Sequence, residues 1–313
     1  MNYRKWYSLK NRITGLSIDI GGTKTSFSIF EKGKVTRNWK VTTSGRDMKS
    51  ISDLLVKTIN DLFSEFEYEQ VAICVPGVAS KEGSVVFAPN IPGSKDFRLS
   101  DQIFKGTGSL PTVIDDRTAL VIGESISFKS ENIVALSIGT GIGAGIMLDG
   151  HVINVDRPLA GSIGWSPAFL NISSDKNVNL EGVASGKIYR NILEFLPNGM
   201  LQDDTNQQEI LDFTKLFTLF DRGDNSAAII INSIKQNLWR YIAVLLNLLS
   251  PEFVVLNGSV GLEIGKRFIK DLKTDVMPFV IPLIRTDINI CVSQAGNVAF
   301  PLGALAFSLV KKN

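Results

Sequence analysis

Two short turns rich in glycine carry the residues best suited to phosphate chemistry. In the first, Asp19 lies near the end of an apolar run that a glycine pair follows. Glycines that adopt positive φ let backbone N–H groups approach an anion without a Cβ in the way. A carboxylate beside a phosphate is repelled unless a cation lies between them, so Asp19 indicates Mg²⁺ bound through water. The candidate nucleotide contacts of this turn are Gly21, Gly22, Thr23 and Lys24.

The turn lies in the stretch Leu16–Phe30, whose alternating apolar and small polar residues predict a β-hairpin. On this segment alone, a plain hairpin with an aspartate at its mouth explains the residues as well as a phosphate site does. A second copy favours the phosphate site, because Leu136–Ile138 repeats Leu16–Ile18 at an offset of 136 − 16 = 120 residues and runs into another glycine-rich turn. Two similar hairpins predict two similar domains. The candidate nucleotide contacts of the second turn are Gly139, Thr140, Gly141 and Gly143.

Phosphoryl transfer also needs a group that orients or deprotonates the acceptor hydroxyl. Asp115 and Asp116 follow the predicted strand Pro111–Ile114 and open a predicted helix over 117–125. Ligands of open α/β sheets gather at the carboxyl ends of strands, which makes this pair a candidate for that role. An aspartate at such a boundary also serves as a helix N-cap, which is the simpler structural interpretation.

The composition limits the other possibilities. With 33 basic and 31 acidic residues among 313, the chain has no charge bias towards nucleic acid or a membrane surface. Two distant cysteines, Cys74 and Cys291, and the single His151 cannot supply a four-ligand zinc site. Their scarcity indicates a reduced, cytoplasmic setting. No stretch offers the ~18 uncharged apolar residues of a membrane span, so no membrane partner is expected.

Apolar periodicity predicts the remaining elements. Strand, helix and strand in sequence indicate α/β domains with mixed sheets. The expected helices are 49–69, 180–196, 208–220, 225–249, with Asn225 as N-cap, and 299–309; the expected strands are 71–75 and 253–256.

The paired hairpins resemble the two phosphate motifs of the actin-like ATPase and sugar kinase superfamily, and within it the chain resembles the ROK family of sugar kinases and repressors. P-loop and Rossmann patterns do not fit either turn. The resemblance implies a two-domain α/β fold of the actin-like ATPase (ribonuclease H-like) type, with mixed sheets flanked by helices and the active site in the interdomain cleft. The expected domains are 1–117, to which the helix 299–313 returns, and 118–298.

The resemblance also assigns residues. The catalytic aspartate of the family lies in an NDAN motif before a helix that ends in GE, and the sequence here is DDRT with Gly123 and Glu124 at the matching distance. Asp116 is therefore expected to be the base and Asp115 a substrate contact. Asn90 falls in a loop that matches the sugar side, and Gly258 and Ser259 fall in the loop that matches the adenosine side.

The chain departs from the family pattern at the sugar pocket. Most members have AGEIGH where this chain has AGSIGW, so Ser162 replaces the sugar-binding glutamate and Trp165 replaces a histidine that touches sugar and zinc. The zinc-binding cysteine cluster is missing too, so no zinc site is expected. Ser162 and Trp165 become contacts in a changed pocket, where Trp165 packs against the C–H face of a pyranose. A core position for Trp165 is the alternative.

The resemblance implies an ATP-dependent, Mg²⁺-requiring kinase that phosphorylates a hydroxyl of a hexose or N-acetylhexosamine. The alternative is a sugar- or nucleotide-binding sensor of the same fold with weak catalysis. A homodimer is expected. No nucleic-acid partner is expected, because only fifteen residues come before Leu16, too few for a DNA-binding domain. The identity of the sugar stays open, as does the choice between ATP and polyphosphate as donor.

Overall fold

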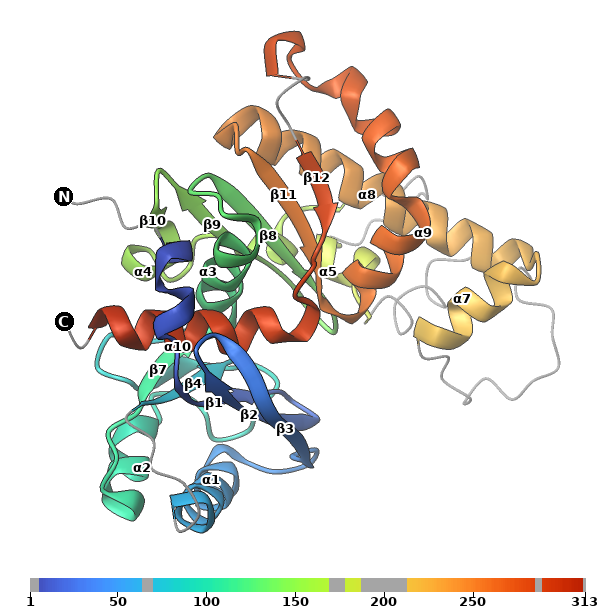
Figure 1. Cartoon of the computed structure of the whole chain (residues 1–313). Coiled ribbons are helices and arrows are strands. Elements are labelled where there is room, and N and C mark those ends of the chain that lie inside the picture. The colour runs from blue at the N-terminus through green and yellow to red at the C-terminus, as the bar shows by residue number, and fades with distance from the viewer. Residues whose placement is uncertain (1–5, 64–69, 169–177, 187–212, 285–288, 312–313) are drawn as a thin grey trace, which may run out of the picture. The chain divides into compact units, whose positions relative to one another are not determined.

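The computed structural model describes residues 6–63, 70–168, 178–186, 213–284 and 289–311. By packing, the chain divides into two compact units (Figure 1). The first comprises Met1–Ile133, Gly145–Ala160 and Gln294–Asn313, and the second comprises Val134–Ala144 and Gly161–Ser293. The predicted domains, 1–117 with 299–313 and 118–298, stay a prediction, because compact units drawn by packing need not coincide with evolutionary domains.

A mixed five-stranded sheet organises the first unit. Its strand order is β3-β2-β1-β4-β7, with β1, β2 and β3 antiparallel and β1, β4 and β7 parallel. The predicted first hairpin and the predicted α/β class with mixed sheets are confirmed. The strands are β1 (Gly15–Ile20), β2 (Lys24–Glu31), β3 (Lys34–Thr42), β4 (Val71–Val75) and β7 (Thr112–Asp115).

Helices cover both faces of this sheet. On one face, α1 (Met48–Phe63) and α2 (Leu99–Thr107) enclose a core with Leu16, Ile18 and Phe27 from the hairpin. On the other face, α10 (Ala299–Lys311) packs against β1 and β4. Because neither face meets water, β1 is buried along its whole length except at Asp19, which is partly exposed.

Two glycines allow α10 to approach α3 (Asp116–Phe128) at backbone distance. A Cβ built on Gly303 would collide with the carbonyl of Ala119, and one built on Gly123 would collide with the carbonyl of Ala299. This close crossing fixes the helix that begins at Asp116 against the sheet. The remaining elements of this unit are η1 (Trp6–Arg12), β5 (Val78–Ala79), β6 (Val85–Phe87), β10 (His151–Val152), α4 (Ile153–Asp156) and η5 (Gly296–Val298).

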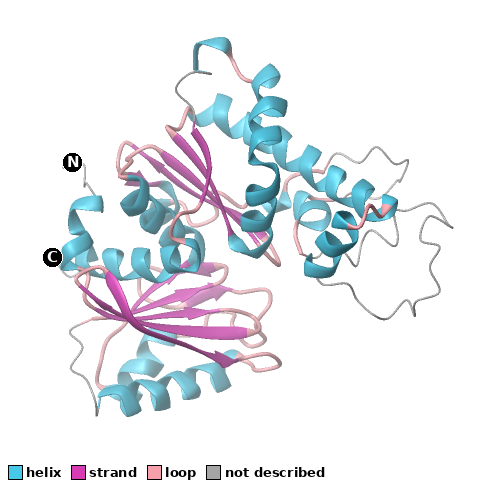
Figure 2. Cartoon of the chain, turned by 45° about the vertical axis from the view of Figure 1, so that its right-hand side comes forward, coloured by secondary structure: helices cyan, strands magenta, loops and turns pink. Residues whose placement is uncertain are grey.

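The second large sheet has the strand order β10-β9-β8-β11-β12 (Figure 1). The strands of the two large sheets are the magenta arrows in Figure 2. Its strands are β8 (Ile133–Ile138), β9 (Ile142–Leu148), β11 (Phe253–Asn257) and β12 (Asn289–Val292), together with β10. The chain passes from the second unit to the first within β9, after Ala144. The helices of the second unit are η2 (Ile163–Trp165), α5 (Leu180–Ala184), α7 (Phe213–Asp221), α8 (Asn225–Leu249), α9 (Gly258–Val276), η3 (Met277–Phe279) and η4 (Pro282–Ile284).

The two hairpins are built alike. Strands β1 and β8 have the same length and the same burial pattern, and a three-residue turn follows each, 21–23 in one and 139–141 in the other. Gly21 is the first residue after β1 and Gly139 is the first residue after β8, so the two hairpins correspond at an offset of 139 − 21 = 118 residues. The offset of 120 from the repeated tripeptide is therefore two residues out of register.

Most predicted elements are confirmed, with three corrections. Helix α8 has the predicted bounds, but its N-cap is Asp224, whose carboxylate accepts from the Ala227 N–H at 2.7 Å, so the prediction of Asn225 is wrong. The predicted helix 49–69 ends at Phe63, and 64–69 lie outside the described residues. The predicted helix 180–196 is wrong as a continuous helix, because α5 ends at Ala184 and the next two residues, Ser185 and Gly186, are not helical. Residues 187–196 of that prediction and residues 208–212 of the predicted helix 208–220 lie outside the described part of the chain. No helix in the described ranges is long and apolar enough to cross a membrane.

Replacing Gly303 by Ala is expected to lower the free energy of unfolding by about 2–3 kcal/mol, because the added methyl group must push α10 away from α3. The measurement is chemical denaturation. Gly261→Ala in α9 is the control, since a Cβ there meets only the side chain of Ile138, at 3.3 Å. That variant should change stability by less than about 1 kcal/mol, its helix propensity offsetting the tight contact. Equal effects in the two variants would contradict the close crossing.

Candidate active site

Three carboxylates gather at one edge of the first sheet. Asp19 pairs with Cys74 in the parallel register of β1 and β4, and Val75 pairs with Asp115 at the end of β7. The carboxyl ends of these parallel strands meet at the same edge, and Asp116 follows directly as the first residue of α3. The predicted base, its neighbour and the predicted Mg²⁺ ligand thus lie in one region of the first unit.

Asp115 is the helix cap. Its carboxylate accepts from the Thr118 N–H at 3.0 Å and from Thr118 Oγ1 at 2.6 Å, and Arg117 Nε lies 3.6 Å from it. Burial raises the pKa of Asp115, while Arg117 and Thr118 oppose that rise. The capping role that competed with catalysis at Asp116 therefore belongs to Asp115. A carboxylate can accept about four hydrogen bonds, and Thr118 donates two of those that Asp115 accepts. Asp115 can therefore still accept from a substrate, and its role as a substrate contact stays a prediction.

Asp116 has the electrostatics of a proton acceptor. Burial raises its pKa to about 7, and the charges of Asp115 and Asp19 add to that rise. Arg117 and a backbone hydrogen bond from Gly77 lower the same pKa. An aspartate with a pKa near neutrality exchanges protons readily at physiological pH, as a general base requires.

Asp19 fits a water-bridged cation. Burial raises its pKa to about 6, and the Cys74 thiol and Lys40 oppose that rise. No cluster of three or more acidic, histidine or cysteine side chains able to hold a metal occurs in the described part of the chain. Mg²⁺ commonly binds through one or two carboxylates, water and substrate phosphate, so Asp19 alone suits this ion. Burial and the nearby carboxylates raise the pKa of the Cys74 thiol well above its usual value.

The first turn is shaped by close backbone contacts. Neither Gly21 nor Gly22 has positive φ, so the predicted positive φ is wrong there. A Cβ on Gly21 would lie 2.7 Å from the carbonyl of Lys24, and one on Gly22 would lie 3.6 Å from Cβ of Asn90. Glycine is required at Gly21 for space. The structure brings the predicted sugar contact Asn90, which is exposed, beside this turn. Thr23 and Lys24 are exposed in the same turn.

The second turn lies against the start of α9. A Cβ on Gly258, which has φ +83°, would lie 2.5 Å from the carbonyl of Ile138, and Ser259 Oγ lies 3.7 Å from a Cβ built on Gly139. The Asn257 side chain accepts from the Gly258 N–H at 2.6 Å. The structure thus brings two predicted nucleotide segments together at a helix N-terminus, where backbone N–H groups and the helix dipole favour phosphate.

The loop 161–165 packs against the same hairpin. A Cβ on Gly164 would lie 2.5 Å from the carbonyl of Ile142 and 3.1 Å from Glu181 Oε2. The same Glu181 oxygen accepts from the Ile142 N–H at 3.1 Å. In this loop, Ser162 is partly buried, whereas Trp165 is 71% exposed. The core alternative for Trp165 is therefore wrong, and its face is open to a ligand.

Sequence reasoning missed two charged side chains. Glu181 joins the second turn to the loop 161–165, and Arg117 hydrogen-bonds three loop carbonyls. For Arg117 a signal existed, because an arginine directly after two aspartates at a helix start indicates that its positive charge compensates theirs. Glu181 lies in a segment that the family resemblance covers, but nothing in its spacing revealed its partners. Within each unit the predicted residues gather, and the predicted interdomain cleft stays a prediction.

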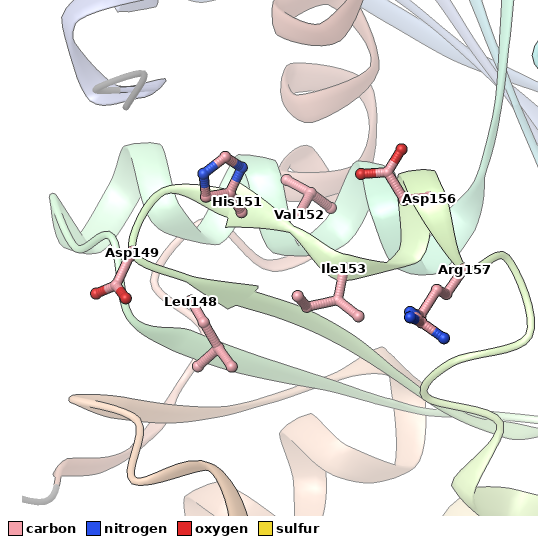
Figure 3. A pocket seen from close by; sticks show the side chains of 7 residues that line it. All are labelled: Leu148, Asp149, His151, Val152, Ile153, Asp156 and Arg157. Atoms are coloured by element: carbon pink, nitrogen blue, oxygen red, sulfur yellow. The ribbon is translucent and has the colours of Figure 1, made fainter. Parts of the chain in front are cut away.

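A cavity of about 330 Å³ lies elsewhere in the first unit. Its lining residues are Leu148, Asp149, His151, Val152, Ile153, Asp156 and Arg157. Figure 3 shows these side chains from the end of β9 through β10 to the end of α4, with His151 and Asp156 on one side and Leu148 and Ile153 on the other. No predicted site residue lines this cavity.

Comparison with known proteins agrees with these features. The family model described as "ROK family" matches residues 15–312 of the sequence. A glucokinase of Thermotoga maritima is 26% identical over 313 residues, covering 95% of this chain and 97% of that protein. An N-acetylmannosamine kinase of Haemophilus influenzae is 27% identical over 257 residues, covering 80% and 82%.

The solved structures share the fold. A ROK family glucokinase from Streptomyces griseus, in complex with glucose and AMPPNP, superposes with a TM-score of 0.77 at 21% identity, covering 95% of this chain and 99% of that one. The predicted actin-like ATPase fold is thereby confirmed.

Asp116→Asn is expected to stabilise the protein at pH 8, because it removes a buried charge. A carboxyl with a folded pKa of about 7, against about 3.9 unfolded, binds its proton more tightly in the folded state. Its contribution to stability is therefore fully present below about pH 4 and is lost as the pH rises through about 7. The variant should gain about 2 kcal/mol at pH 8, half the value for full burial, since Asp116 is partly exposed.

The measurement is chemical denaturation at pH values from 4.5 to 8. Asp53→Asn is the control, since Asp53 is exposed and pairs with Lys49 on the surface of α1. The Asp116→Asn advantage should shrink towards zero at low pH, and Asp53→Asn should show no such trend. An advantage that did not depend on pH would contradict the raised pKa of Asp116.

Proposed function

We propose that this chain, which belongs to the ROK family, is an ATP-dependent sugar kinase that transfers the γ-phosphoryl group to a hydroxyl of a hexose or N-acetylhexosamine. One observation carries the proposal. Asp115 caps the helix, which leaves Asp116, with a pKa of about 7, as the carboxylate suited to take a proton. The similarity to a glucokinase and an N-acetylmannosamine kinase supports the acceptor class.

Asp116 accepts the proton of the acceptor hydroxyl as its oxygen attacks the γ-phosphorus. The bond between the γ-phosphorus and the bridging oxygen breaks, and ADP leaves with that oxygen. The backbone hydrogen bond from Gly77 orients this carboxylate. Asn90, on the neighbouring loop, and Asp115 bind sugar hydroxyls. Since phosphoryl transfer is catalysed mainly by positioning and charge neutralisation, a single well-placed base is enough for the proton.

The two turns hold the nucleotide phosphates through backbone N–H groups. Gly21 and Gly22 serve in the first turn, and Gly139 and Gly141 serve in the second, where the N-terminus of α9 adds its dipole. Asp19 would hold Mg²⁺ through water, and the ion would supply positive charge against the phosphates. Gly258 and Ser259 contact the adenosine side.

Ser162 and Trp165 shape an acceptor pocket that differs from the family pattern. The exposed indole of Trp165 offers a flat apolar face to the C–H side of a pyranose ring. Ser162 offers a shorter hydrogen-bonding group than a glutamate. These replacements change which sugar binds, whereas the groups needed for phosphoryl transfer are kept. A cytoplasmic homodimer remains the expectation for the assembled protein.

Asp116→Asn is expected to lower kcat by about 10² to 10⁴, because a positioned base contributes a factor of that size. Affinity for sugar and ATP should be kept, since the amide preserves the shape. The measurement is phosphorylation of glucose, mannose, N-acetylglucosamine and N-acetylmannosamine with ATP. The wild-type kcat/KM should fall as the pH drops below about 7, the range in which Asp116 becomes protonated.

Asp115→Asn is the matched control. It restores the usual family residue and removes a charge that raises the pKa of Asp116, so the acidic fall in kcat/KM should move to lower pH. Sugar affinity should change more than kcat. If Asp116→Asn turned over like the wild type while Asp115→Asn was inactive, the two roles would be exchanged. A wild-type protein that bound one of these sugars but phosphorylated none, with ATP or polyphosphate, would be a sensor.

A further inference from the structure

Arg117 is a buried cation bound by backbone. It is 7% exposed, and its guanidinium donates to the carbonyls of Gly77 at 3.1 Å, Pro158 at 2.7 Å and Ala160 at 3.2 Å. From these contacts we infer that Arg117 is a positioning residue that ties the catalytic carboxylate Asp116 to the segment from which the acceptor loop departs. The inference rests on the proposed kinase function and deepens it by naming what sets the acceptor geometry.

The geometry requires arginine. Guanidinium carries five N–H donors in a rigid planar fork, so one side chain can reach three carbonyls and still face Asp115, 3.6 Å from Nε. Lysine has one ammonium group and cannot span these partners. A buried guanidinium is stable only if its charge is compensated, and Asp115 supplies that charge. The family pattern has Asn at the position of Asp115 and Ala at the position of Arg117. The carboxylate and the guanidinium therefore form a matched pair in this chain.

Gly77 relays the effect of Arg117 to the base. The N–H of Gly77 donates to the Asp116 carboxylate, while its carbonyl accepts from Arg117. Gly77 has φ +118°, and a Cβ there would collide with the carbonyl of Phe87, so only glycine fits. Gly77 thus lies between the guanidinium of Arg117 and the carboxylate of Asp116.

The other end of the fork fixes the start of the acceptor loop. Pro158 and Ala160 belong to a turn closed by a hydrogen bond from the Ala160 N–H to the Arg157 carbonyl at 2.8 Å. The Ala160 carbonyl also accepts from Asn154 Nδ2 at 2.8 Å. The next residue in sequence opens the segment that carries Ser162 and Trp165. Arg117 therefore fixes the last residues of the first unit before this segment.

Arg117 also adds a charge close to the base. The charged and titratable groups that act on Asp116 are Asp115 and Asp19, which raise its pKa, and Arg117, which lowers it; Asp116 in turn acts on the thiol of Cys74. Loss of Arg117 should therefore raise the pKa of Asp116. A charge effect and an anchoring effect can be separated, because lysine keeps the first and loses most of the second.

The experiment compares Arg117→Met and Arg117→Lys with the wild type. Arg117→Met should raise the sugar KM at least tenfold, leave the ATP KM within about twofold, and move the acidic fall of kcat/KM about one pH unit upward. Arg117→Lys should return that fall to near its wild-type pH while the sugar KM stays high. Arg98→Met is the control, an exposed arginine of the same unit that pairs with Asp101. It should change none of these values.

Two further readouts do not depend on turnover. Calorimetry measures sugar affinity directly, and the pH dependence of unfolding follows the Asp116 proton without substrate. In Arg117→Ala, added guanidinium should recover part of the sugar affinity, and urea of equal concentration should not. Arg117 variants with wild-type sugar affinity and an unshifted pH dependence, altered only in melting temperature, would overturn the inference. A wild-type protein without kinase activity would instead overturn the proposed function and leave these two readouts decisive for Arg117.

Discussion

Burial of carboxylates at one sheet edge is the constraint on which the rest of the first unit depends. Water stabilises a free carboxylate, and partial removal of that water raises the pKa of Asp19, Asp115 and Asp116. The sheet and its covering helices must hold these groups together against their mutual repulsion. Each carboxylate has its own compensation: Cys74 and Lys40 for Asp19, Thr118 and Arg117 for Asp115, and Gly77 and Arg117 for Asp116. Because different neighbours lower the pKa of each carboxylate, three chemically identical groups can have different roles in the proposed function.

In the proposed function, the second unit binds phosphate, which is an anion. The start of α9 approaches the hairpin at the carbonyl of Ile138, and the loop 161–165 approaches it at the carbonyl of Ile142. Glycines at both contact points, Gly258 and Gly164, make this approach possible. Positive φ matters at Gly258, whereas missing side-chain volume matters at Gly164 and at Gly21 in the first unit. The glycines are therefore explained by packing of backbone on backbone as much as by the needs of a phosphate.

The sequence was sufficient for the hairpins, the mixed sheet and the long helix α8, because each follows from local hydrophobic pattern. Strand β3 was not predicted, although its apolar residues Val35, Trp39 and Val41 lie at alternate positions. The signal is weak because the strand lies at the sheet edge and is largely exposed. The pairing of the repeats was two residues out of register because the tripeptide match is chemical, whereas register depends on where each strand ends. Either aspartate fits the sequence pattern of a helix cap. Only the structure shows that Asp115 is the cap and that Asp116 is not. The contacts of Arg117 and Glu181 depend on partners more than 35 residues away in sequence, beyond the reach of any local pattern.

The central claim is that Asp116, and not Asp115, is held with a pKa near neutrality in the free protein. The most direct measurement is a ¹³C NMR titration of the side-chain carboxyls in protein labelled at aspartate, with Asp116→Asn and Asp115→Asn used to assign the two resonances. The account predicts a resonance with a midpoint of about 7 that disappears in Asp116→Asn and moves to lower pH in Asp115→Asn. A midpoint near 4 for Asp116, or a resonance with a midpoint of about 7 that disappears in Asp115→Asn instead, would contradict it.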